Sequence, residues 1–241
     1  MTFLPRGSAE PDPMPDQPAE EPILITHDML VKAPRRPSGR VDFEQGMSYA
    51  PRLTLLLIVI NTIVFAWEVA NGALQSKQSI IAAGALARDN VLQGEAWRLF
   101  TPMFLHGSPD HLIGNMIALY ILGMALEHAV GFSQMLLLYF VSGLTGSLAS
   151  MALSPGPSVG ASGAIFGVMA GVTIFLYTHQ QRFHVRDKRI SFVLIVWALF
   201  TIVTGLASPY VDNAAHAGGF LGGMLMGRVV KPVERVPRFD A

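Results

Sequence analysis

Four polar side chains that lie in otherwise apolar stretches have the types and the spacing needed for chemistry. Ser162 stands in Gly160-Ala-Ser-Gly163, His216 stands in Ala215-His-Ala-Gly-Gly219, and His111 precedes Asn115 by four residues. A serine hydroxyl, a histidine able to take its proton and two further hydrogen-bond donors are the groups that nucleophilic acyl transfer needs. The chemistry follows only if the fold brings the four residues together.

Each of these residues also has a purely structural interpretation. The spacing of His111 and Asn115 puts both on one helical face, where they can form a hydrogen bond to another helix. Two glycine repeats with a period of four residues lie beside Ser162 and His216, and such repeats let helices approach closely. The repeats are Gly163, Gly167 and Gly171, and Gly219, Gly223 and Gly227. On this interpretation His216 is a satisfied polar residue at a helix contact.

The composition indicates a membrane protein. The chain has 241 residues, of which 51% are hydrophobic and 14% are charged, with a mean hydropathy of +0.42. Because soluble domains carry about 25% charged residues, these values exclude disorder over the whole chain and argue against an ordinary soluble enzyme. Seventeen basic residues balance seventeen acidic ones, so no net positive charge is available to bind nucleic acid. The lack of cysteine excludes disulfides, thiolate catalysis and zinc bound by cysteine.

Six apolar segments are long enough to cross the hydrocarbon core, which takes roughly 20 helical residues. They are predicted at about Leu53–Ala73, Asp110–Val130, Ser133–Leu153, Gly160–Thr178, Ile190–Ser208 and Asp212–Val230. The preceding stretch holds eight of the sixteen prolines and lacks the features of a signal peptide, so we predict a disordered cytoplasmic tail over residues 1–48. The other predicted parts are a six-helix transmembrane domain over 49–231 and a cytoplasmic tail over 232–241.

The basic residues predict the orientation of these segments. With the N-terminus in the cytoplasm, 14 of the 17 Lys and Arg residues lie in cytoplasmic parts of the chain, as the positive-inside rule requires. The second, fourth and sixth segments then all run from the outside inward. Because the four polar residues lie near the starts of these segments, we expect them at one depth, just below the outer surface.

Over about residues 50–230 the chain resembles the rhomboid family of intramembrane serine proteases. The matching features are Trp97-Arg98, His106, the stretch from His111 to Asn115, the stretch from Gly160 to Gly163, and Ala215-His216 with the glycines that follow. Each feature is short, and their order and spacing together carry the resemblance. It implies an all-α membrane protein with a rhomboid-like bundle of six transmembrane helices.

The resemblance also implies a role for each matching residue. Ser162 corresponds to the nucleophile and His216 to its general base and acid, in a dyad that requires no carboxylate. The side chains of His111 and Asn115, with the backbone N–H of Ser162, correspond to the oxyanion hole. The positions interpreted as structural are Trp97, Arg98, His106, Gly160, Gly163, Gly219 and Gly223.

Three further residues bear on the site. Phe166 stands where many family members have tyrosine, which keeps a ring to stack near His216 and loses the hydroxyl. Asp212 lies four residues before His216 and can orient the imidazole if the helix extends that far. Glu127, near the inner end of the second segment, is interpreted as structural.

The function implied is an intramembrane serine endopeptidase that cleaves transmembrane segments of other proteins near the outer membrane face. No metal or organic cofactor is implied, since no acidic or histidine cluster has ligand spacing across the segments. The expected partners are transmembrane protein substrates and the lipid bilayer, and the oligomeric state stays open. A bacterial plasma membrane, with both termini in the cytoplasm, is the expected location.

Two alternative functions are kept. A catalytically inactive rhomboid relative that binds membrane proteins would usually lack the serine or the histidine, and this chain has both. A small-solute transporter would place polar groups near the midplane and show an internal repeat, whereas these polar residues are expected on one side.

Overall fold

The computed structural model describes residues 50–179, 185–206, 208 and 211–233, with side chains throughout these ranges except at 185–191 and 204. The tail predicted over 1–48 lies outside the described residues, as does the tail predicted over 232–241 apart from its first two positions. Every described element is helical, and the single strand-like contact among them is an antiparallel bridge between Leu86 and Ser158.

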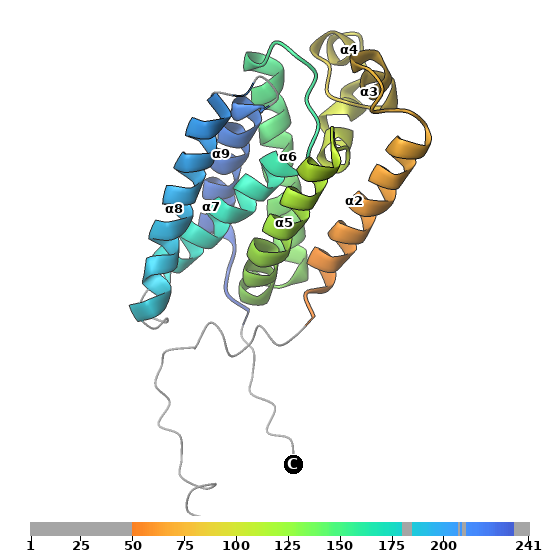
Figure 1. The fold of residues 1–241 in the computed structure, drawn as a ribbon. Helices are drawn as coiled ribbons and strands as arrows, with labels where there is room; N and C mark the ends of the chain where they lie inside the picture. The colour runs from red at the N-terminus through yellow and green to blue at the C-terminus, as the bar shows by residue number, and fades with distance from the viewer. Residues whose placement is uncertain (1–49, 180–184, 207, 209–210, 234–241) are drawn as a thin grey trace, which may run out of the picture. The chain divides into compact units, whose positions relative to one another are not determined.

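Six long helices form the body of the described chain (Figure 1). They are α2 (Arg52–Ala70), α5 (Pro109–Val130), α6 (Phe132–Leu153), α7 (Ser162–Thr178), α8 (Val185–Leu206) and α9 (Asn213–Val229). Each lies at one of the six predicted segments, with ends that differ by a few residues. By length and composition α2, α5 and α6 are able to cross a membrane, while α7 and α9 have 17 residues each, about 26 Å.

The shorter length of α7 reflects its central position. It packs against α5, α6, α8 and α9, and 13 of its 17 residues are buried. A helix that is enclosed by other helices does not have to match the thickness of the hydrocarbon, because the surrounding protein shields its ends. The sequence predicted an apolar segment here and did not predict its central place.

The contact between α7 and α9 is made by glycine against glycine. A Cβ atom on Gly219 would lie 1.9 Å from the carbonyl oxygen of Gly163, and one on Gly223 would lie 2.0 Å from that of Gly167. No other residue fits at such distances, so the two glycine repeats bring the backbones themselves into contact. This contact begins beside Ser162 and His216.

The segment between α2 and α5 is built from short helices that lie beyond one end of both (Figure 1). They are α3 (Lys77–Ala83), α4 (Arg88–Leu92), and the 3-10 helices η2 (Ala96–Leu99) and η3 (Thr101–Phe104). The buried Arg98 guanidinium donates to the carbonyls of Ile81 (2.5 Å) and Ala85 (3.0 Å) and to the Glu95 carboxylate (2.5 Å). The Trp97 ring covers the same guanidinium at 4.3 Å. Trp97-Arg98 therefore holds this segment together.

Glu127, at the opposite end of α5, fastens α5 to the start of α2. Its carboxylate accepts from the backbone N–H groups of Leu53 and Thr54, each at 2.9 Å, and from the Thr54 hydroxyl at 2.8 Å. The first N–H groups of a helix have no partner within the helix, and Pro51 at the N-cap of α2 offers no side-chain acceptor. Glu127 supplies the missing acceptor from another helix.

Candidate active site

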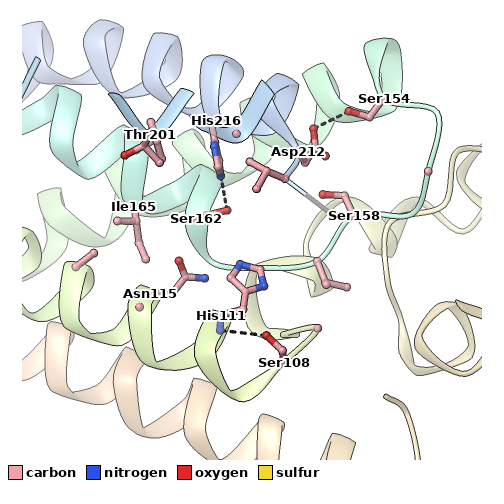
Figure 2. A pocket seen from close by; sticks show the side chains of 18 of the residues that line it. Ser108, His111, Asn115, Ser154, Ser158, Ser162, Ile165, Thr201, Asp212 and His216 are labelled. Carbon is pink, nitrogen blue, oxygen red and sulfur yellow. Dashed lines mark hydrogen bonds between the residues drawn. The ribbon is translucent and has the colours of Figure 1, made fainter. Parts of the chain in front are cut away.

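Ser162 and His216 lie face to face at the starts of α7 and α9. The Ser162 Oγ atom and the His216 Nε2 atom form a hydrogen bond of 2.9 Å (Figure 2). Ser162 is the first residue of α7, and His216 follows the first residue of α9 by three positions. Because the glycine contact brings these two helix starts together, a serine and a histidine 54 residues apart become a bonded pair.

Gly160 shapes the turn that presents Ser162. Its φ angle of +127° is one that side-chain-bearing residues rarely adopt. Its N–H donates to the carbonyl of Pro102 at 2.8 Å, which ties the turn to η3. A Cβ atom at this position would lie 2.6 Å from Cε1 of His111. Glycine is therefore required both by the backbone angle and by the approach of the His111 ring.

His111 and Asn115 reach the same place from α5. Figure 2 shows both side chains facing Ser162 across the cavity. The Ser108 hydroxyl caps α5 by accepting from the backbone N–H of His111 at 3.2 Å, which fixes the helix start that carries both residues. The Asn115 side chain is 8% exposed, and its Nδ2 group has no hydrogen-bond partner among the described residues. The alternative of a hydrogen bond from this amide nitrogen to another helix is therefore not seen.

The His216 ring is positioned by stacking and not by a carboxylate. The Phe166 ring lies parallel to it, with centroids 4.2 Å apart and an interplanar angle of 7°. The Nδ1 atom of His216 has no hydrogen-bond partner in the described part of the chain. The stack expected from the resemblance is present, while the carboxylate of Asp212 bonds to other groups and not to the imidazole.

A cavity of about 1130 Å³ opens in front of the serine. Side chains from α5, α7, α8 and α9 line it, and Trp197, Thr201 and Gly205 are the α8 residues among them. Ser162, His216, His111 and Asn115 all border this cavity. Its volume is large enough to hold several residues of an extended peptide.

His106 lies behind His111, outside the long helices. Its ring is fully buried and meets the His111 ring edge-on, with centroids 5.2 Å apart. Burial is the main cause that lowers the pKa of His106, to about 3, so the imidazole is neutral at physiological pH. Its backbone N–H donates to the buried Glu68 carboxylate of α2. His106 thus supports His111 from behind and does not reach the cavity.

The described residues contain no group of three or more His, Cys, Asp or Glu side chains that could hold a metal ion. The arrangement instead provides a hydroxyl bonded to an imidazole, two donors on the opposite wall, and a cavity between them. Sequence reasoning missed that the Ser150 and Ser154 hydroxyls donate to Asp212. The four-residue spacing of these serines was the available signal.

Comparisons with known proteins agree with the geometry. The Rhomboid domain family matches residues 93–232. The chain is 34% identical over 195 residues to "Rhomboid protease GluP" of Bacillus subtilis (strain 168), a match that covers 81% of this chain and 37% of that protein. It is 42% identical over 150 residues to "RHOMBOID-like protein 5" of Arabidopsis thaliana, covering 61% of this chain and 48% of the relative.

A third relative is matched over most of its length. The chain is 32% identical over 204 residues to "Rhomboid protease AarA" of Providencia stuartii, covering 72% of this chain and 70% of that protein. The chain spans less than half the length of the other two relatives. With its apolar helices the protein is an integral membrane protein. The family match covers more than half of the sequence, and the chain belongs to the rhomboid family.

Proposed function

We propose that this protein is an intramembrane serine endopeptidase in which Ser162 is the nucleophile and His216 is the general base and acid. The observation that carries the proposal is the 2.9 Å hydrogen bond between Ser162 Oγ and His216 Nε2 at the wall of a large cavity. His216 Nε2 takes the hydroxyl proton as Ser162 attacks the scissile carbonyl carbon. It then gives that proton to the leaving amine, and water releases the acyl group from Ser162.

The oxyanion is proposed to be held by His111, Asn115 and the backbone N–H of Ser162. The Ser162 N–H is the first of α7, and such N–H groups have no acceptor within their own helix. The unpaired Nδ2 group of Asn115 faces the same space. Donors that are already in place when negative charge develops stabilise the transition state without reorganisation.

The substrates are proposed to be transmembrane segments of other proteins, cleaved near the outer membrane face. Six spanning helices with both termini in the cytoplasm put the starts of α5, α7 and α9, and so the dyad, on the outer side. The charge distribution favours this orientation. The proposed location is a bacterial plasma membrane. Two of the relatives are named rhomboid proteases, which supports the activity.

A substrate is proposed to reach the cavity past α8. This helix contributes Trp197, Thr201 and Gly205 to the cavity wall, and most of its described side chains are exposed. Because the chain has no cysteine, one engineered cysteine pair on α8 and α5, joined by a bifunctional reagent long enough to span the cavity that both line, can test this route without background pairing. Cleavage that is unchanged by the cross-link would rule the route out.

The direct test is cleavage of a generic transmembrane test substrate by purified protein in liposomes. We expect the wild type to cut, and Ser162→Ala and His216→Ala to be folded and inactive. Cleavage that survives in either variant would contradict the proposed chemistry. If the folded wild type cuts none of the substrates and merely binds them, the inactive rhomboid-like binding factor becomes the better interpretation.

A further inference from the structure

The Asp212 carboxylate makes a set of contacts that the proposed chemistry does not use. It lies at the N-cap of α9, four residues before His216, and lines the cavity. One carboxylate oxygen accepts from the Ser154 hydroxyl at 2.6 Å and from the Ala215 N–H at 3.0 Å. The other oxygen accepts from the Ser150 hydroxyl. A single side chain thus joins the last turn of α6 to the first turn of α9 (Figure 2).

This junction matters because the contact of α9 with α7, the helix that carries Ser162, is smooth. Along α7 the contact is made by Gly163 and Gly167 against Gly219 and Gly223, with backbone lying on backbone. Glycines allow close approach, but they have no side chains to interdigitate. The contact therefore offers little resistance to sliding or rotation of one helix along the other. The directional hydrogen bonds of Asp212 at the start of α9 supply the restraint that the glycine contact between α7 and α9 lacks.

The position of α9 directly determines the position of the imidazole. Because His216 Nδ1 has no partner among the described residues, no third group aims the ring at Ser162 through a hydrogen bond. Phe166 fixes the plane of the ring by stacking, and a stacked ring restrains sliding within that plane less than a directional hydrogen bond does. The distance from Nε2 to Ser162 Oγ therefore depends on where the first turn of α9 stands.

We propose that Asp212, through Ser150 and Ser154, is a positioning residue that fixes the first turn of α9 against α6 and so sets His216 at hydrogen-bond distance from Ser162. This inference rests on the proposed function. The carboxylate of a catalytic triad bonds to the imidazole itself, whereas Asp212 holds the helix that carries the imidazole. A serine protease site needs its groups placed within about 0.5 Å, which a clamp of this kind can enforce.

The test uses the serines, because removing them leaves the N-cap bond to Ala215 in place. We expect the double variant Ser150→Ala/Ser154→Ala to cut a transmembrane test substrate with kcat lowered about 10- to 100-fold and KM little changed. The rate at which a fluorophosphonate labels Ser162 should fall by a similar factor, since labelling needs the activated hydroxyl but no substrate helix. Matched controls are Ser133→Ala, at the exposed start of α6, and Asp89→Asn, an exposed carboxylate in α4. Both should react like the wild type.

Variants of Asp212 itself separate geometry from charge. Asp212→Ala should lose at least as much labelling rate as the double serine variant, and adding both serine changes to it should cost nothing more. Asp212→Asn keeps an oxygen that can accept from Ala215 and Ser154, so it should retain more activity than Asp212→Ala. Equal losses for Asp212→Asn and Asp212→Ala would assign the effect to the charge and overturn the positioning role.

The outcomes distinguish the positioning role of Asp212 with Ser150 and Ser154, called the clamp here, from the proposed function. If the folded wild type neither cuts nor is labelled at Ser162, the proposed function fails and the clamp fails with it. If the wild type reacts and the double serine variant reacts equally fast, the clamp alone is wrong. A variant with a lower thermal midpoint and an unchanged kcat would likewise overturn it, since the serines would then be purely structural.

Discussion

Replacing Gly219 by alanine tests whether the seam between α7 and α9 sets the geometry of the dyad. A Cβ atom on Gly219 would lie 1.9 Å from the carbonyl oxygen of Gly163, whereas real Cβ atoms essentially never approach a neighbour within 3.0 Å. The two backbones must therefore separate by about 1 Å at this point. Gly163 directly follows Ser162, and Gly219 comes three residues after His216. The separation consequently acts on the 2.9 Å hydrogen bond of the dyad.

This displacement predicts two measurable losses. Overpacking of this kind destabilises a folded protein by about 1–3 kcal/mol. A misplacement of about 1 Å at reacting groups lowers turnover about 100-fold. Both are measured on one preparation, with initial rates of cleavage of a transmembrane test substrate in liposomes and thermal unfolding in detergent. The loss in kcat should exceed the loss expected from the unfolded fraction alone.

Gly227→Ala is the matched control. It adds the same methyl group to the same face of α9, eight residues and about 12 Å further along the helix. There the added Cβ would lie 3.0 Å from the Cβ of Ile174 and 3.2 Å from the Cα of Gly171, a tight fit that needs a shift of only a few tenths of an ångström. We expect this variant to keep a kcat near that of the wild type. If Gly219→Ala also keeps it, the seam does not set the dyad geometry and the reasoning is refuted.

Three other perturbations give distinct readouts. Asn115→Ala should lower kcat about 10²- to 10³-fold with little change in the thermal midpoint, because it removes an unpaired oxyanion donor and few contacts. A normal kcat would exclude Asn115 from the oxyanion hole. Glu127→Ala should instead lower stability, by about 1–2 kcal/mol, because α2 loses its cap, and the folded fraction should keep its kcat. A lowered kcat in fully folded protein would show that Glu127 acts on the site. Acidification below the ordinary histidine pKa of 6.5 should destabilise the fold, because the unfolded imidazole of His106 binds a proton that the folded one, with a pKa of about 3, does not. His106→Phe should weaken this loss of stability on acidification, by up to about 1.4 kcal/mol per pH unit between those values, and an unchanged pH dependence of unfolding would contradict the assignment.

The positions of the long helices could be predicted from the sequence, and so could the shared location of the candidate site residues. Hydrophobic length located the six long helices, and the alternation of direction put the starts of α5, α7 and α9 on one side. Ser162, His216, His111 and Asn115 each lie in the first turns of these helices, so a shared direction is enough to bring them to one depth. The glycine period of four likewise predicted a close helix contact beside the serine.

The side-chain contacts that hold these helices in register could not be predicted from the sequence. Asp212 was considered as a partner for the imidazole four residues away, but it bonds to serines about 60 residues earlier in the chain. Glu127 caps α2 through the backbone N–H of Leu53, which lies 74 residues before it. Such pairings depend on how helices pack and on side-chain rotamers, neither of which follows from periodicity. The central burial of α7 also depends on packing: α7 is the most apolar of the six helices, but that property does not identify the helices that enclose it.

The measurement that tests the central claim most directly is the site of covalent labelling by a fluorophosphonate, read by mass spectrometry of the intact and digested protein. The wild type in detergent or liposomes should carry one adduct, on Ser162, and His216→Ala should remain unlabelled although it is folded. An adduct on another residue, or labelling of Ser162 that persists at the wild-type rate without His216, would contradict the proposal that His216 activates Ser162.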